Sequence, residues 1–125
     1  MSGPTTTNKA VIMLTTGLED AEKVTVALPT AVGAAESGRP TLVFLAKEAV
    51  RLALRDHAKG VACDGCPQIA GLMDRYVAAG GRFIACGVCV NSKQLDKSQL
   101  LEAAEVAGTV QLWEWIGDGA TTFSF

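Results

Sequence analysis

Short uninterrupted apolar runs recur along the chain, each bounded by polar or glycine residues. The first two occupy residues 10–14 (Ala-Val-Ile-Met-Leu) and 41–46 (Thr-Leu-Val-Phe-Leu-Ala), and a third, 82–86, ends in a cysteine. A run of this length without polar alternation is typical of a strand that is buried on both faces, as in a parallel sheet. The tail, residues 120–125, predicts a last strand.

Segments with apolar residues at helical spacing separate these runs. In the segment 20–38, Asp20 is of a type that caps helices and Gly38 is of a type that ends them. Pro67 suits the first position of a further helix, which Gly80 stops. The remaining predicted helices span 47–55, 96–107 and 109–116.

Strands that alternate with helices predict an α/β fold, in which right-handed crossovers cover both faces of a parallel sheet. We therefore expect a three-layer α/β/α arrangement with a mainly parallel sheet of about 4–5 strands. In such folds the turns from strand to helix gather on the carboxyl edge of the sheet, and functional sites form there.

Composition narrows the class of protein. The 125 residues, 49% of them hydrophobic and 19% charged, suffice for one globular domain. We expect a flexible segment at 1–8 and a single domain at 9–125. The net charge of -2 without a basic patch argues against a nucleic-acid partner. The apolar runs are too short to span a bilayer and the first residues lack a secretory signal, so we expect a cytoplasmic protein with no membrane partner.

The cysteines form two Cys-x-x-Cys pairs, Cys63/Cys66 and Cys86/Cys89. Pairs at this spacing can bind a metal, form a redox disulfide or hand sulfur to one another. Cys86 ends the third predicted strand and so lies on the carboxyl edge. The helix from Pro67 is roughly as tall as the sheet, at about 1.5 Å per residue, which places Cys66 in its capping position on the same edge. A helix N-terminus favours thiolate, the form that attacks sulfur or binds metal.

Segments along nearly the whole chain share a pattern with one family of proteins. The most specific of them is Ile84-Ala85-Cys86-Gly87-Val88-Cys89, a strand that ends in a cysteine with a second cysteine three residues on. The others are the first strand with its turn (9–17), the Ala-rich helix that ends in Gly38, the second strand with Glu48-Ala49-Val50 after it, and the closing segment from Asp96 to Trp115. In these segments the chain resembles the DsrE family, the DsrE/DsrF-like and YchN-like sulfur-relay proteins.

The resemblance implies a DsrE-like domain with flavodoxin-like layering and a role in sulfur relay. It implies that Cys86 accepts sulfur as a persulfide, that Cys89 is a resolving or assisting thiol, and that Cys63 and Cys66 support them. Such a sulfurtransferase-type carrier needs no cofactor, has sulfur donor and acceptor proteins as partners, and commonly forms a homo-oligomer, a trimer or a hexamer. The chain departs from the family where 91–95 replaces an Arg-Gly-Leu element, and the first cysteine pair is not general among relay members.

Two other functions stay open from the residues alone. The four cysteines Cys63, Cys66, Cys86 and Cys89 can form a site for zinc or an iron–sulfur cluster, because the gap between the pairs falls in the range of about 15 to 20 residues known from zinc sites. Alternatively, the first pair can be the redox centre of a dithiol/disulfide protein. A relay needs one essential thiol, a redox pair needs two and a metal site needs four.

A few further side chains are expected near these positions. Lys47 and Glu48 follow the second predicted strand and are expected to edge the site. His57, the only histidine, precedes the first cysteine pair and is expected to be a solvated loop residue. Trp113 and Trp115 lie on opposite sides of a short predicted helix, so one of them is expected to be exposed or at an interface.

Overall fold

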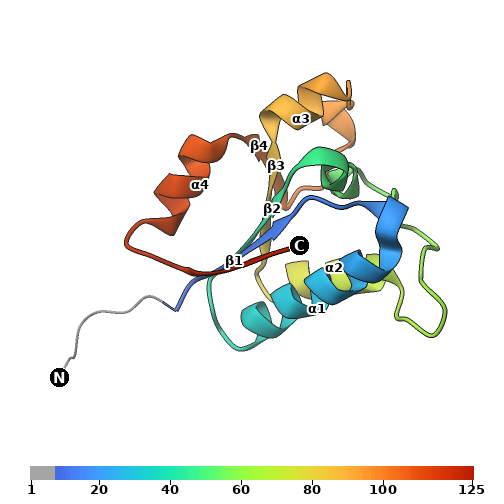
Figure 1. The fold of residues 1–125 in the computed structure, drawn as a ribbon, viewed down its shortest axis with the longest axis horizontal. Coiled ribbons are helices and arrows are strands. Elements are labelled where there is room, and N and C mark those ends of the chain that lie inside the picture. The colour runs from blue at the N-terminus through green and yellow to red at the C-terminus, as the bar shows by residue number, and fades with distance from the viewer. Residues whose placement is uncertain (1–7) are drawn as a thin grey trace.

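The computed structural model describes residues 8–125, so all but the last residue of the segment 1–8, which is predicted to be flexible, lies outside the described residues. Within 8–125, five strands form one parallel sheet in the order β4-β3-β2-β1-β5 (Figure 1). Their bounds are Ala10–Leu14 (β1), Thr41–Leu45 (β2), Arg82–Cys86 (β3), Ala104–Ala107 (β4) and Thr121–Ser124 (β5). The helices are Ala21–Glu36 (α1), Ile69–Ala78 (α2), Gly87–Ser92 (α3) and Thr109–Ile116 (α4), with 3-10 helices at Leu18–Asp20 (η1), Lys47–Ala53 (η2) and Lys97–Gln99 (η3).

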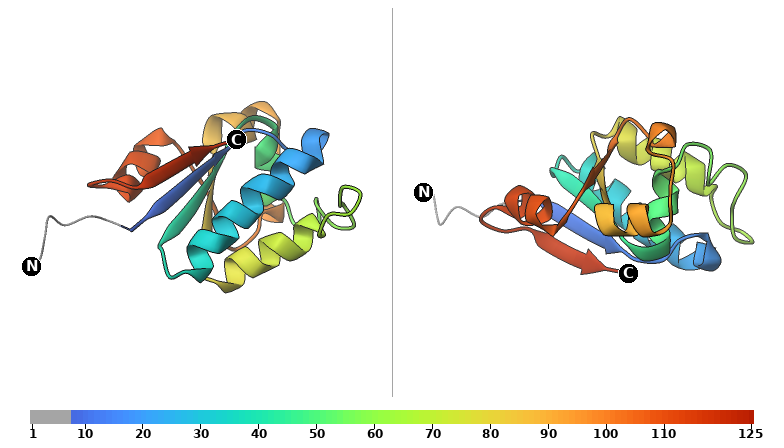
Figure 2. Two further views of the ribbon diagram at one scale, coloured as in Figure 1. Left: turned by 60° about the horizontal axis from the view of Figure 1, so that its bottom comes forward. Right: turned by 90° about the horizontal axis from the view of Figure 1, so that it is seen from above.

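Alternate side chains of the strands build two cores, one on each face of the sheet. Ile12 and Leu14 belong to the larger core, which they share with buried residues of α1 and α2. Val11 and Met13, which alternate with them along β1, face a smaller core that contains Leu112 of α4. Figure 2 shows α1 and α2 side by side across one face, and α4 lies on the other (Figure 1). The predicted three-layer α/β/α fold is therefore confirmed.

The predicted helix over 96–107 is wrong. Its residues form η3 and then strand β4, which pairs with β3 from Phe83↔Ala104 to Cys86↔Ala107. Just before this ladder the Phe83 N–H donates to the Ala103 carbonyl at 3.0 Å. Alanine and glutamate favour a helix intrinsically, but this preference is weak, and the open edge of β3 offers backbone groups that need hydrogen-bond partners.

The predicted helix over 47–55 exists in a tighter and shorter form. Its residues build the 3-10 helix η2, which ends when Leu54 leaves it to form an isolated antiparallel bridge with Leu100. The predicted cap of α1 is confirmed, since Asp20 Oδ1 accepts a hydrogen bond from the Lys23 N–H at 3.1 Å.

Helix α4 presents one tryptophan on each side, as its sequence predicts. Trp113 is 69% exposed, whereas Trp115 packs against the smaller core. None of the helices formed by residues 8–125 has the length and apolarity that a membrane crossing requires.

The end of the chain completes the sheet beside its beginning. Strand β5 pairs with β1 from Ala10↔Thr121 to Met13↔Ser124. The pairing continues past the strand, because the Phe125 N–H donates to the Met13 carbonyl at 2.7 Å and the Phe125 carbonyl accepts from the Thr15 N–H at 3.0 Å. The carboxyl ends of all five strands therefore meet at one edge.

Candidate functional site

Cys86 and Cys89 lie at the carboxyl edge, where the sequence places them. Cys86 is the last residue of β3 and the N-cap of α3, and Cys89 follows within that short helix. Both side chains are half-buried and both thiols are free. Cys86 packs against both cores of the sheet, so its position is fixed by the fold while part of its side chain stays accessible.

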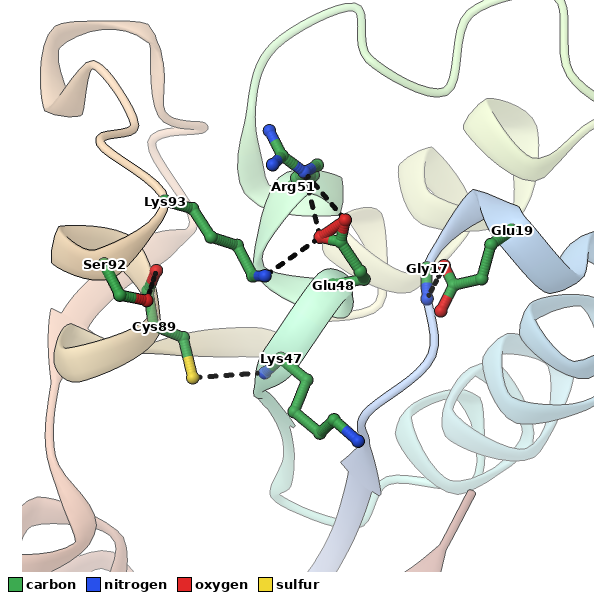
Figure 3. A network of polar contacts seen from close by, with 8 residues as sticks. All are labelled: Gly17, Glu19, Lys47, Glu48, Arg51, Cys89, Ser92 and Lys93. Carbon is green, nitrogen blue, oxygen red and sulfur yellow. Dashed lines mark hydrogen bonds and ion pairs between the residues drawn. The ribbon is translucent and has the colours of Figure 1, made fainter.

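The thiol of Cys89 faces the backbone at the start of η2. The Lys47 N–H donates a hydrogen bond to Cys89 Sγ at 3.2 Å, while the Lys47 side chain extends away from the sulfur (Figure 3). The φ angle of Lys47 is 55°, a left-handed conformation that is uncommon for a residue with a side chain. Residues in such conformations cluster at functional sites, where the surrounding structure holds them in place.

An ion-pair network joins η2 to the end of α3. Glu48 binds Arg51 at 3.0 Å and Lys93 at 3.1 Å, and Lys93 directly follows α3 (Figure 3). The hydrogen bond from Arg51, followed by that from Lys93, lowers the pKa of Glu48 below its ordinary value. The network and the contact between Lys47 and Cys89 hold the two segments together across the site.

Gly17 keeps the turn after β1 close to the same segment. A Cβ atom at this position would lie 2.7 Å from the Glu48 carbonyl oxygen, so a larger residue does not fit without a shift. The Gly17 N–H donates to Glu19 Oε1 at 2.8 Å, which closes the turn locally (Figure 3). The ends of β1, β2 and β3 are thus packed into one compact edge around Cys89.

Cys63 and Cys66 are joined in a disulfide in the loop before α2. The prediction that Cys66 caps this helix is wrong, because α2 begins at Ile69 with Gln68 as its N-cap. The Ile69 N–H instead donates to the Val61 carbonyl at 3.0 Å and closes the base of the loop. Cys66 therefore lies in a turn outside the helix and does not gain the environment of a helix N-terminus.

The two cysteine pairs lie at the same end of the sheet but contact different elements. Cys63 Sγ lies 3.7 Å from the Thr25 hydroxyl in the second turn of α1, whereas Cys89 contacts the start of η2. Across residues 8–125, no group of three or more His, Cys, Asp or Glu side chains is arranged to hold a metal ion. The four-cysteine metal site stays a prediction, and it would require the disulfide to open and the loop to move.

The sequence indicates some of the side chains that surround the site and gives no signal for others. Lys47 and Glu48 edge the site as expected, but the pattern gives no signal for Lys93, a charged residue just past a short helix. His57 is half-buried, and burial, then the Arg51 charge, lowers its pKa below its ordinary value. The position of Arg51, three residues after Glu48, is the usual one for an ion pair on a helix, and this spacing is the signal in the sequence that could have identified it.

Several known proteins are similar to this chain in sequence or in fold. The chain is 26% identical over 104 residues to the protein MK0008 of Methanopyrus kandleri, covering 83% of each. The ychN protein from E. coli matches with a TM-score of 0.73 and 20% identity over 94% of this chain and 100% of that one. The protein MTH1491 from Methanobacterium thermoautotrophicum matches with a TM-score of 0.66 and 16% identity over 94% and 99%.

These two structural likenesses are at low identity and show the fold alone, which agrees with the layers and the strand order described above. The sequence itself shows the family, because the model of the DsrE/DsrF-like family matches residues 8–125, nearly the whole chain. The chain therefore belongs to the DsrE/DsrF-like family.

Proposed function

We propose that the protein carries sulfur as a persulfide on Cys86 and passes it to a thiol of a partner protein. The observation that carries this proposal is the half-exposed free thiol of Cys86 at the carboxyl end of β3, with a second free thiol, Cys89, one helical turn further. Membership of the DsrE/DsrF-like family supports the same role, because the resemblance to its sulfur-relay members implies a persulfide on the cysteine that ends this strand.

The loading step is a thiol exchange that needs no oxidant or reductant. The Cys86 thiolate attacks the outer sulfur of a donor persulfide, R–S–SH, and forms a new S–S bond. The S–S bond of the donor breaks, and the donor leaves as the thiolate R–S⁻. Delivery is the same reaction in the other direction: the thiolate of an acceptor attacks the outer sulfur and returns Cys86 as a thiolate.

Cys89 is the assisting thiol in this proposal. Its sulfur accepts the Lys47 N–H at 3.2 Å, which holds the side chain beside the start of η2. A Cys89 thiolate that attacks the outer sulfur of the Cys86 persulfide takes over that sulfur and releases Cys86 as a thiolate. The pair then shares one sulfur atom with no net oxidation, and the cargo can leave from either cysteine.

The proposed partners are sulfur donor and acceptor proteins, and the proposed assembly is a homo-oligomer, a trimer or a hexamer. Two large apolar side chains support an assembly of this kind: Val110 and Trp113 of α4 are 64% and 69% exposed. Exposed apolar side chains grouped on a helix are typical of protein contacts. Native mass spectrometry measures the number of subunits, and a monomer at micromolar concentration would contradict this part of the proposal.

The test of the relay is persulfide loading followed by intact mass spectrometry. Reduced, metal-free protein is treated with glutathione persulfide, and mass additions of one sulfur atom are counted. All variants are made in a parent protein in which Cys63 and Cys66 are both replaced by serine, because these thiols would also react once they are reduced. We expect loading of this parent protein and loss of stable loading when Cys86→Ser is added. Equal loading of Cys86→Ser and the parent protein would refute the assignment of Cys86.

A separate, untreated preparation distinguishes the relay from the metal-site prediction. Protein purified without oxygen is analysed for metal content and for reactive thiols before any treatment. A zinc ion or an iron cluster held by all four thiols would favour the metal site, whereas metal-free protein with reactive Cys86 and Cys89 would favour the relay.

A further inference from the structure

The proposed relay uses Cys86 and Cys89 and leaves the other pair without a role. We propose that Cys63 and Cys66 form a second and separate site, a dithiol/disulfide pair that exchanges electrons with an external dithiol. This inference goes beyond the proposed function and does not depend on it, because neither thiol of the carrier pair takes part.

The disulfide lies on the surface of the fold and does not hold the core together. Between Val61 and Ile69 no residue is buried, and the residues inside the pair, Asp64 and Gly65, are exposed. The bond closes a ring across a sequence separation of only three, and short rings remove little entropy from the unfolded chain. The oxidation state of the pair can therefore change while the fold stays intact.

The turn between the two cysteines keeps them close by itself. The Cys66 N–H donates to the Cys63 carbonyl at 2.9 Å, and Gly65 has a φ angle of 75°, as the third position of a type II turn requires. The Cα atoms of the cysteines lie 5.1 Å apart, a separation suited to a disulfide and normal for the ends of a turn. The loop is thus arranged for both states, and neither requires a large rearrangement.

The two sulfur atoms have different surroundings. From this difference we infer which sulfur an incoming thiolate attacks and which one leaves. Cys63 Sγ lies 3.7 Å from Thr25 Oγ1, and that hydroxyl donates its own proton to the Ala21 carbonyl at 2.7 Å. Thr25 therefore turns its lone pairs to the sulfur and can accept a hydrogen bond from Cys63 once it is a thiol. Cys66 Sγ contacts the Asp64 carbonyl at 3.6 Å within the loop itself, so it is the sulfur that an incoming thiolate reaches.

The reaction balances with the external dithiol as the reductant. Its first thiolate attacks Cys66 Sγ and forms a mixed disulfide, while Cys63 leaves as a thiolate and takes up a proton. The second thiolate of the external dithiol then attacks the first sulfur of the same dithiol, which is bonded to Cys66 Sγ. This S–S bond breaks, and Cys66 leaves as a thiolate and is protonated. Two electrons and two protons pass to the protein, and the external dithiol becomes a cyclic disulfide. The reverse sequence oxidises the pair.

The test uses the full chain with Cys86 and Cys89 both replaced by serine, so that only the proposed pair can react. Metal-free protein is equilibrated in mixtures of reduced and oxidised dithiothreitol without denaturant, and the thiols are then alkylated and counted by mass spectrometry. We expect a reversible two-electron transition with an unchanged circular dichroism spectrum. A pair that excess dithiothreitol never reduces, that never oxidises, or whose reduction unfolds the protein would overturn the proposal.

Two glycine variants test whether the turn sets this equilibrium. In Gly65→Ala a side chain is forced into the left-handed conformation, and nothing within 4 Å obstructs the new Cβ, so only backbone strain is added. Because the dithiol state can relax the turn and the disulfide cannot, the equilibrium constant for oxidation should fall at least about fivefold. Gly60→Ala is the matched control, since Gly60 has a φ angle of 76° in the same loop, also with nothing within 4 Å, but lies outside the turn. Equal shifts in the two variants would contradict a role of this turn.

Discussion

The hydroxyl oxygen of Tyr76 makes hydrogen bonds to backbone groups at the amino ends of both β2 and β3. Tyr76 is fully buried in α2, and its hydroxyl lies 2.7 Å from the Arg82 carbonyl and 3.0 Å from the Thr41 carbonyl. It also accepts the Arg82 N–H at 3.1 Å. Tyr76→Phe keeps the ring, which packs edge-on against Phe83 at 5.0 Å between centroids, and removes only the oxygen.

The cost of this change follows from the groups that lose their partner. A buried donor or acceptor left unsatisfied costs about 1–3 kcal/mol, so the loss around Arg82 and Thr41 should lower the free energy of unfolding by about 3 kcal/mol. At a urea slope of about 2 kcal/mol/M, the midpoint should fall by about 1.5 M with an unchanged slope. Phe83→Leu is the control, because it weakens the ring contact and leaves the hydroxyl in place. A loss below about 1 kcal/mol in Tyr76→Phe would show that the hydroxyl does not support the two strands in this way.

The same hydroxyl predicts a pH dependence with a definite sign. Burial raises the pKa of Tyr76 well above its ordinary value of 10.0, because the phenolate is disfavoured inside the fold. The unfolded chain loses its proton first, so the stabilisation is complete below pH 10 and decreases as the pH rises further. Tyr76 is the only tyrosine, so phenolate absorbance reports on it alone, and Tyr76→Phe lacks this decrease. An equal loss of stability in both proteins above pH 10 would argue against the raised pKa.

Two further predictions concern the site edge and the packing behind it. Glu48→Gln removes the carboxylate that ties α3 to η2, so alkylation of Cys89 by iodoacetamide should become several times faster at an unchanged melting temperature, and an equal rate would contradict the proposed tie. Gly81→Ala places a Cβ that clashes with Cε1 and Cζ of the Tyr76 ring, so it should lower the free energy of unfolding by about 1–3 kcal/mol in urea denaturation. Gly71→Ala, on the exposed side of α2 where a Cβ meets nothing closer than 3.9 Å, should be neutral or stabilising, and equal losses in the two variants would contradict the steric explanation.

The parts of the fold that could be predicted are those whose pattern has one physical solution. An uninterrupted apolar run such as 10–14 has to be buried on both faces, and the glycines at the ends of helices limit where the crossovers run. Strand β4 could not be found in this way, because the segment 104–107 combines good helix formers with an exposed glutamate. What makes it a strand is the free edge of β3, which is a property of the folded neighbour and not of the segment.

In the candidate site, too, features set by local sequence could be predicted, whereas features set by contacts between distant segments could not. The position of Cys86 follows from the end of a predicted strand, and Cys89 follows from its spacing. The left-handed backbone of Lys47 and the ion pair of Lys93 with Glu48 depend on how two loops meet in space, which a single sequence does not reveal. The start of α2 shows that a local signal can also mislead. Pro67 is a good first helical residue, but the backbone of the preceding loop keeps it outside the helix, which begins at Ile69.

The pairing of β5 with β1 has a consequence for synthesis on the ribosome. The two strands are joined by contacts as far apart in sequence as 110 residues, between Thr15 and Phe125. Because β1 is synthesised well before β5, one edge of β1 stays unpaired until residues 121–124 have also left the exit tunnel. An unpaired strand edge is a template for association with other chains. At about 5–20 residues per second, the residues between β1 and β5 take several seconds to be synthesised, and this interval is the stage at which protection by a chaperone would matter most.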